Sequence, residues 1–321
     1  MWAILALLAT LLTSFLPILN KQLLRDARPA LVAWAINAAS LPLLAAGTLL
    51  LAQCKVEGLL DGVSFACTAY LPQIDVIFVV GVLGSAVLNW AATLLSTHAL
   101  SRADASLVTP LLTFNPAFTL LVALVMLGEI PGLQQVLGVT IILFGAYLLE
   151  VREARTGLLT PLLILVRRPG AALAIVASML WGTTTVLEKL AIEHVRPPSG
   201  PLVALVGTTI TVVLLTPNAL APLFRPDNSA TRADTLKQPG LFGGLGAHRP
   251  ALLAAAIIAG IAPLFGFTAI ATGLVGYVTA LFKLSAVFTV LWAWLFLGEG
   301  NLRSRLLGAF VMILGSALVA S

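Results

Sequence analysis

One positive charge lies inside an otherwise apolar run of this chain. Lys283 stands in the segment ALFKLSAVFTV, about a turn and a half inside a predicted helix. An ionisable side chain among apolar neighbours is costly, so we take it as a candidate functional group. An ammonium group there could bind a carboxylate or a phosphate. The alternative is that its long stem carries the charge to the nearer membrane interface.

Small polar and aromatic side chains accompany Lys283 in the other apolar runs. They offer hydroxyl, amide and indole groups to a bound solute. We take as further candidate binding residues Thr113, Asn115, Thr109, Thr279, Ser285, Asn89, Trp90, Trp181, Thr184 and Ser14. Each also has a structural explanation, because Ser and Thr in membrane helices usually bond to their own backbone or to a neighbouring helix.

The composition says which elements position these residues. Hydrophobic residues make up 60% of the 321 residues and charged residues 10%, against about 45–50% and 25% in a soluble domain. A membrane-spanning helix needs about 20 mostly apolar residues. We therefore predict an all-α integral membrane protein with ten transmembrane helices, at 2–23, 29–52, 74–97, 104–127, 133–150, 170–191, 201–224, 250–272, 277–298 and 303–320.

The chain also repeats itself. FTLLVALVMLGE, which ends at Glu129, returns 170 residues later as FTVLWAWLFLGE, which ends at Glu299. Further matches extend the repeat: Gly138 and Gly145 with Gly308 and Gly315, and Lys21 with Lys189. We predict a first five-helix repeat at 1–151, a basic linker at 152–169, and a second repeat at 170–321 that contains a polar loop at 225–249. Because five is odd, the two repeats enter the membrane in opposite directions.

The two Gly-Glu pairs invite a structural interpretation. Gly128-Glu129 and Gly298-Glu299 each close an apolar run, where glycine marks a turn. A carboxylate at the end of a helix is unfavourable for the helix dipole, so we expect these glutamates to have partners. We expect Glu188 to lie at the outer interface and to pair with its neighbour Lys189.

This pattern resembles the drug/metabolite transporter superfamily in its ten-helix, EamA-type form. The resemblance rests on the doubled LGE followed by a G-x6-G helix, on Trp181-Gly182 followed by Lys189, and on the five-plus-five layout. It covers nearly the whole chain, although Thr13-Ser14 replaces Trp-Gly in the first repeat. It implies alternating access, with a central cavity lined by helices 4 and 9 together with helices 1, 3, 6 and 8.

The predicted function is secondary transport of small metabolites such as amino acids or organic anions, by an exporter or exchanger. Two alternatives are a flippase for a lipid-linked head group and a non-transporting membrane scaffold or accessory subunit. No enzyme, cofactor or metal motif is present, and the basic residues indicate no nucleic-acid groove. We expect a small-molecule substrate, the lipid bilayer, and a monomer or homodimer.

The charges in the predicted helices bear on energy coupling. We find no Asp or Glu in the middle of any of the ten runs, which disfavours export of polycationic drugs. Protons are the candidate coupling ion, and they would use His98, Lys283 or a carboxylate at a helix end. Glu129 and Glu299 are two such carboxylates.

The distribution of Lys and Arg predicts orientation. They gather in the loops after helices 1, 3, 5, 7 and 9, which we place in the cytoplasm, so both termini lie outside. The location would be a bacterial inner (plasma) membrane. Cys54 and Cys67 share the loop between helices 2 and 3, on the oxidising side, where they either form a disulfide or remain two unpaired small residues.

Overall fold

The structure is a computed structural model of the whole chain. It describes residues 1–23, 26–27, 29–57, 64–67, 72–102, 111–153, 169–224, 245–246, 248–297 and 302–320. Of the residues singled out above, Thr109, Gly298 and Glu299 lie outside these ranges. The side chains of Lys21, Cys54 and Cys67 are also not described.

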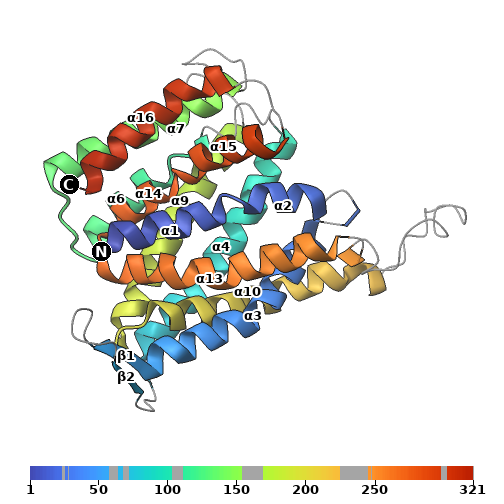
Figure 1. Cartoon of the computed structure of the whole chain (residues 1–321), viewed down its shortest axis with the longest axis vertical. Helices are drawn as coiled ribbons and strands as arrows, with labels where there is room; N and C mark the ends of the chain where they lie inside the picture. Colours follow the sequence, from blue (N-terminus) through green and yellow to red (C-terminus); the bar gives the residue numbers. More distant parts are fainter. Residues whose placement is uncertain are drawn as a thin grey trace, which may run out of the picture.

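The described chain is almost entirely helical (Figure 1). The helices of the first half are α1 (Trp2–Thr13), α2 (Leu16–Leu23), α3 (Pro29–Gln53), α4 (Val76–Arg102), α6 (Asn115–Met126) and α7 (Leu133–Glu153). Those of the second half are α9 (Pro169–Glu193), α10 (Gly200–Phe224), α13 (Arg249–Thr272), α14 (Val275–Phe282), α15 (Ser285–Leu297) and α16 (Leu302–Ala320).

Four short strands lie beside the helices. β1 (Cys54–Glu57) pairs with β2 (Ser64–Cys67), and β3 (Gln73–Ile74) pairs with β4 (Val195–Arg196), both antiparallel. The register of the first pair places the backbones of Cys54 and Cys67 directly opposite each other. That register brings the two residues together, and their disulfide stays a prediction.

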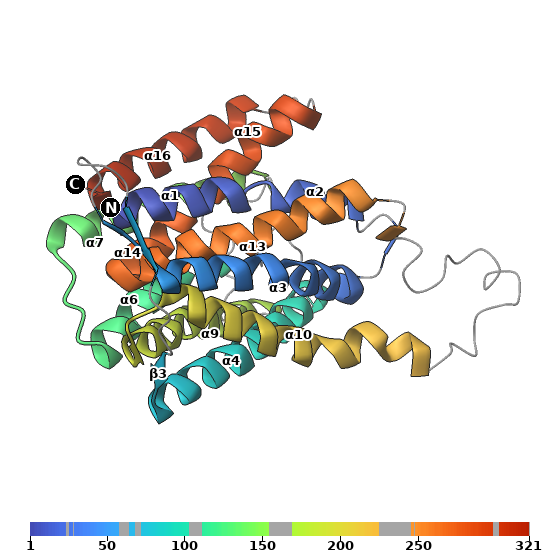
Figure 2. The same ribbon diagram turned by 60° about the horizontal axis from the view of Figure 1, so that its bottom comes forward.

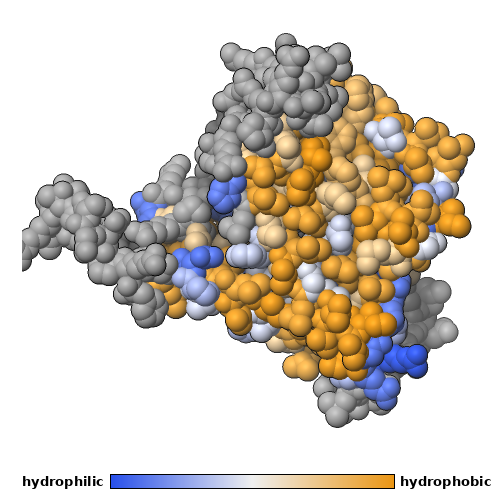
Figure 3. Space-filling view, turned by 180° about the vertical axis from the view of Figure 1, so that it is seen from behind, coloured by the Kyte–Doolittle hydropathy of each residue, from blue (hydrophilic) through white to orange (hydrophobic). Residues whose placement is uncertain are grey.

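The lengths and compositions of the helices fit a bilayer. Within the described residues, six segments are long and apolar enough to cross it, and four shorter apolar helices accompany them. Apolar residues cover the middle of the face in Figure 3, and hydrophilic residues gather towards its edges. The prediction of an all-α membrane protein is confirmed.

The two ends of the helix bundle differ. Both chain termini lie at one end, which we call the terminus end (Figures 1 and 2). α10 finishes and α13 begins at the opposite end, which we call the loop end. The helices run between these two ends, so each side chain has a definable depth.

The same helical break occurs in both halves of the chain. Helical hydrogen bonding is interrupted at Thr113–Phe114 before α6 and at Lys283–Leu284 before α15, 170 residues apart. The backbone bond from Phe114 N to Leu111 O has its counterpart from Leu284 N to Leu281 O. The sequence repeat is therefore also a repeat of backbone geometry, and Lys283 lies at the break itself.

Equivalent helices of the two halves also contact one another: α3 with α10, and α7 with α16. The backbones of α7 and α16 approach closely, and the repeated glycines form this contact. A Cβ atom on Gly145 would lie 2.8 Å from the carbonyl oxygen of Gly308, and one on Gly138 would lie 2.9 Å from that of Gly315. Because Gly145 meets Gly308 and Gly138 meets Gly315, the sequence runs in opposite directions along the two helices, and α7 and α16 are antiparallel.

Candidate functional site

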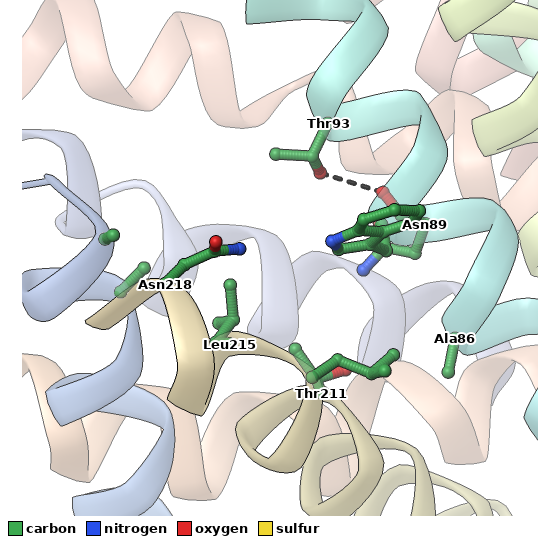
Figure 4. Close-up of a pocket in the computed structure, with 10 residues that line it drawn as sticks. Ala86, Asn89, Thr93, Thr211, Leu215 and Asn218 are labelled. Atoms are coloured by element: carbon green, nitrogen blue, oxygen red, sulfur yellow. Dashed lines mark hydrogen bonds between the residues drawn. The ribbon is translucent and has the colours of Figure 1, made fainter. Parts of the chain in front are cut away.

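A cavity of about 520 Å³ opens between α3, α4 and α10. Most of its wall is apolar, and its polar groups come from α4 and α10. The lining residues are Ala30, Ala33, Ala86, Asn89, Trp90, Thr93, Thr211, Leu214, Leu215 and Asn218. Figure 4 shows Asn218 and Asn89 on opposite sides of the hollow. Apolar walls with a few polar groups are typical of small-molecule sites.

Asn89 is the best-connected polar group of this cavity. Its side-chain oxygen accepts a hydrogen bond of 3.0 Å from Nε1 of Trp181 on α9. Its backbone oxygen accepts one of 2.8 Å from the Thr93 hydroxyl, drawn in Figure 4. The side-chain amide is thereby oriented, and its NH2 group remains available as a donor. Three predicted site residues, Asn89, Trp90 and Trp181, thus lie at or beside the cavity.

The helices that line this cavity include one of the expected set. α4 is the predicted helix 3, whereas α3 and α10 are the predicted helices 2 and 7. The central cavity expected between helices 4 and 9 stays a prediction. Where the structure describes these two helices, they pack closely. A Cβ atom on Gly276 of α14 would lie 3.1 Å from Cβ of Leu120 on α6, so these two helices fill the space between them.

The hydroxyl groups among the predicted site residues mostly serve the backbone. Thr279 donates to the oxygen of Gly276 and Thr184 to that of Leu180, each at 3.0 Å. Ser14 donates to Leu11 O and accepts 2.8 Å from Trp292 Nε1, so it joins α1 to α15. The structural explanation given above holds for these three.

The remaining predicted residues surround the two breaks. Thr113 is buried and Lys283 is half-buried, each within its own break, and Ser285 begins α15. Asn115 begins α6, and its side-chain oxygen is buried without a hydrogen-bond partner in the described part of the chain. A buried acceptor of this kind normally has a partner, such as an ordered water or a ligand.

A buried ion pair at the terminus end joins the two halves. Lys189 of α9 pairs with Glu129, and their side chains are only 9% and 11% exposed. Lys189 Nζ also donates 2.6 Å to Gly273 O, and the other carboxylate oxygen of Glu129 accepts 2.9 Å from Val275 N. Charges this deep require such additional hydrogen bonds.

The surroundings of the ion pair hold it in place. Gly128 adopts φ +66°, a left-handed conformation that reverses the chain after α6 and presents Glu129. The hydroxyl of Tyr277 accepts 2.9 Å from Gly132 N in the following turn. The crevice beside Glu129 holds only about 10 Å³, about the least that admits one water.

One expectation about α9 needs correction. Lys189 is buried and pairs with Glu129, 60 residues away, instead of with its neighbour Glu188. α9 continues to Glu193, so Glu188 lies five residues before the end of a stretch that is long and apolar enough to span a membrane. The expectation that Glu129 needs a partner was right.

The doubled architecture matches a known family. The sequence model of the EamA-like transporter family matches residues 1–151 and again residues 168–321. The chain belongs to the EamA-like transporter family. It is therefore a membrane transporter of small molecules by family, and the sequence-based assignment to the drug/metabolite transporter superfamily is confirmed.

The fold of this EamA-like transporter has been seen before. A solved structure titled "Crystal structure of protein" is similar to it with a TM-score of 0.68 and 17% sequence identity. The similarity covers 99% of this chain and 96% of that one. No curated protein matches the chain. The arrangement in this EamA-like transporter is thus a cavity open between α3, α4 and α10, and a terminus end closed by charge.

Proposed function

We propose that this protein is a secondary transporter of small metabolites such as amino acids or organic anions, working by alternating access. It crosses the membrane ten times as two inverted five-helix repeats, residues 1–151 and 170–321, joined by the 152–169 linker. It serves as an exporter or exchanger in a bacterial inner membrane. The observation that carries the proposal is the asymmetry of the bundle, with a cavity on one side and a closed terminus end.

The placement of the cavity supports alternating access. Its lining from α10 runs from Thr211 to Asn218, in the half of that helix nearer Phe224 and the loop end. The ion pair of Lys189 and Glu129 lies at the terminus end. A solute in the cavity is therefore separated from the terminus end by the ion pair, as a conformation open to one side requires.

The inverted relationship has its own support. Helices α7 and α16 occupy equivalent places in the two repeats and cross in antiparallel directions through equivalent glycines. The break at Thr113 has its counterpart at Lys283. Interrupted helices in corresponding positions of the two repeats are a common way to build transporter sites.

We expect the ion pair of Lys189 and Glu129 to break and re-form when the protein changes conformation. Its two members belong to different repeats, and each is bonded to the other repeat's backbone or side chain. Separation of the repeats at this end would break all of these bonds at once and hydrate both charges. Because the pair costs desolvation free energy while buried, it can hold the end closed without making opening prohibitive.

The cavity amide gives a first prediction. Asn89→Leu removes the donor and acceptor groups while keeping the size, so we expect about a tenfold loss of solute affinity, equal to one good hydrogen bond to a charged solute. Trp181→Phe removes only the indole donor and should cost less. The measurement is the KM of uptake into proteoliposomes. An unchanged KM in both variants would show that the solute does not contact this cavity.

Lys283 gives a second prediction. With a panel of anionic and neutral metabolites, Lys283→Gln is expected to lose about tenfold or more in transport of anions, since a bond to a charged group is removed. Transport of neutral solutes should persist, and Lys283→Arg, which keeps the charge, should retain anion transport. If Lys283→Gln moves anions as well as the unmodified protein, Lys283 is not an anion site. If no solute moves at all, the scaffold alternative replaces transport.

A further inference from the structure

A carboxylate inside the bundle has no role in the arrangement described so far. Glu188 lies five residues before the end of α9, within the membrane-spanning stretch from Gly170 to Glu193. Its side chain is half-buried. It makes no hydrogen bond or ion pair with any residue that the structure describes. An intramembrane carboxylate is expensive, so its presence calls for a function.

The packing of α9 fixes two of its sides. One side faces α4, because a Cβ atom on Gly81 of α4 would lie 3.0 Å from Leu187 O and 3.1 Å from Cβ of Ala191. The opposite side faces α6, because a Cβ atom on Gly182 would lie 2.8 Å from Thr119 N. Lys189, seven residues after Gly182, reaches Glu129 from that same side.

The other two sides differ in exposure. The outer side carries Val176 and Met179, which are 46% and 50% exposed. At 100° per residue, Glu188 falls on the remaining side, in line with Trp181 and Ile192. Trp181 on this side bonds to the cavity residue Asn89, and Ile192 is 1% exposed. Glu188 therefore points into the protein, away from the outer face.

The depth of Glu188 places it between the two functional elements. It follows Trp181 by seven residues, two helical turns or about 10 Å towards the terminus end. It immediately precedes Lys189, whose ammonium group donates hydrogen bonds to Glu129 and to the backbone oxygen of Gly273. The Glu188 carboxylate thus lies between the cavity and the ion pair of Lys189 and Glu129. At this depth, access to water changes when the protein switches conformation.

Few other charges act on this position. Among the elements that contact α9, α10 has no ionisable residue, α6 has none before Glu129, and β4 carries Arg196 beyond the end of α9. α4 carries His98 and Arg102 and α13 carries Arg249, all near the loop end of their helices. α14 brings Tyr277, whose hydroxyl bonds to Gly132 N. On α9 itself, Lys189 is the adjoining charge, and Glu193 with His194 lies at the end of the helix.

We propose that Glu188 is a proton-binding site that couples proton movement to the transport proposed above, on which this inference rests. A proton passes from water to a carboxylate oxygen when one end is open, which gives a neutral acid. The proton returns to water from the same oxygen when the other end is open. No other reactant is needed, because only an O–H bond forms and breaks. A neutral Glu188 crosses between conformations without a buried unpaired charge, which is the physical basis of the coupling.

The direct test is infrared spectroscopy of the full-length protein in detergent, titrated with pH. The unmodified protein should show a carboxylic-acid C=O band that depends on pH. Glu188→Gln should lack this band, and the matched control Glu193→Gln, an exposed carboxylate at the end of the same helix, should retain it. A band that persists unchanged in Glu188→Gln would overturn the proposal.

A second measurement tests the coupling itself. In proteoliposomes with amino acids as solutes, an imposed pH gradient should stimulate transport by the unmodified protein and by Glu193→Gln. Glu188→Gln should lose about tenfold of that stimulation while still exchanging solute at equal pH on both sides. Equal stimulation of Glu188→Gln would overturn the coupling. Failure of the unmodified protein to exchange any solute would count against the proposed function instead, and the infrared result would still decide whether Glu188 binds a proton.

Discussion

Lys189→Met is expected to destabilise the folded protein by about 3–5 kcal/mol, because it leaves the Glu129 carboxylate buried without its counter-charge. Only 11% of the Glu129 side chain is exposed, so water cannot replace the ammonium group. The double variant Glu129→Gln/Lys189→Met should recover most of the loss, since neither charge then remains. The measurement is the free energy of unfolding by titration with a denaturing detergent, arranged as a double-mutant cycle.

A second ion pair in the chain provides the control for this cycle. His248 contacts Asp26 at 2.8 Å, and their side chains are 29% and 51% exposed. Exposed pairs contribute about 0–1 kcal/mol, so Asp26→Asn should change stability little. A Lys189→Met variant as stable as Asp26→Asn, or a double variant as unstable as Lys189→Met, would show that the buried pair does not hold the terminus end.

Gly145→Leu is expected to separate α7 from α16. Even a Cβ atom at this position would lie 2.8 Å from both Gly308 O and Met312 N, which are backbone atoms of the partner helix and cannot rotate away. Overpacking costs about 1–3 kcal/mol and occasionally more, which exceeds the gain of about 1 kcal/mol from replacing a helical glycine. We expect a clear fall in the midpoint of thermal unfolding.

Gly207 of α10 is the matched control. It is also a helical glycine, but no atom lies within 4 Å of the position of its Cβ. Gly207→Leu should therefore leave the midpoint unchanged or raise it slightly. If both variants unfold at the same temperature, the close contact of α7 and α16 is not needed for stability.

The sequence predicts those features of this protein that follow from its composition and from its internal repeat. The 60% apolar content led to a membrane protein, and the repeated LGE segment led to the family. The break at Thr113 is followed by Pro116, which fits the first turn of α6. The second break, at Lys283, has no proline near it, since Ala286 stands where Pro116 stands in the first repeat. Proline alone therefore does not explain the two breaks.

The features that the sequence did not reveal depend on tertiary contacts. A helix-end glutamate signals the need for a partner, but nothing local indicates that Lys189, 60 residues away, provides it. Glu188 and Lys189 are neighbours in sequence, and only the packing of α9 shows that Lys189 pairs with Glu129 and not with Glu188. The cavity between α3, α4 and α10 was not predicted, because side-chain packing, which no periodicity encodes, decides where space remains.

The central claim is that the two ends of the bundle open alternately and that the ion pair governs the terminus end. The most direct test is pulsed electron-spin distance measurement on a protein in which Cys54 and Cys67 are serine. Spin labels at Ile130 and Thr272, both exposed, report on the terminus end, and labels at Thr93 and Asn218 report on the rim of the cavity. In Lys189→Met the first distance should lengthen and the second should shorten, relative to the protein with its ion pair, because opening hydrates the unpaired Glu129 carboxylate. Two distances that change in the same direction, or that do not change, would contradict the account.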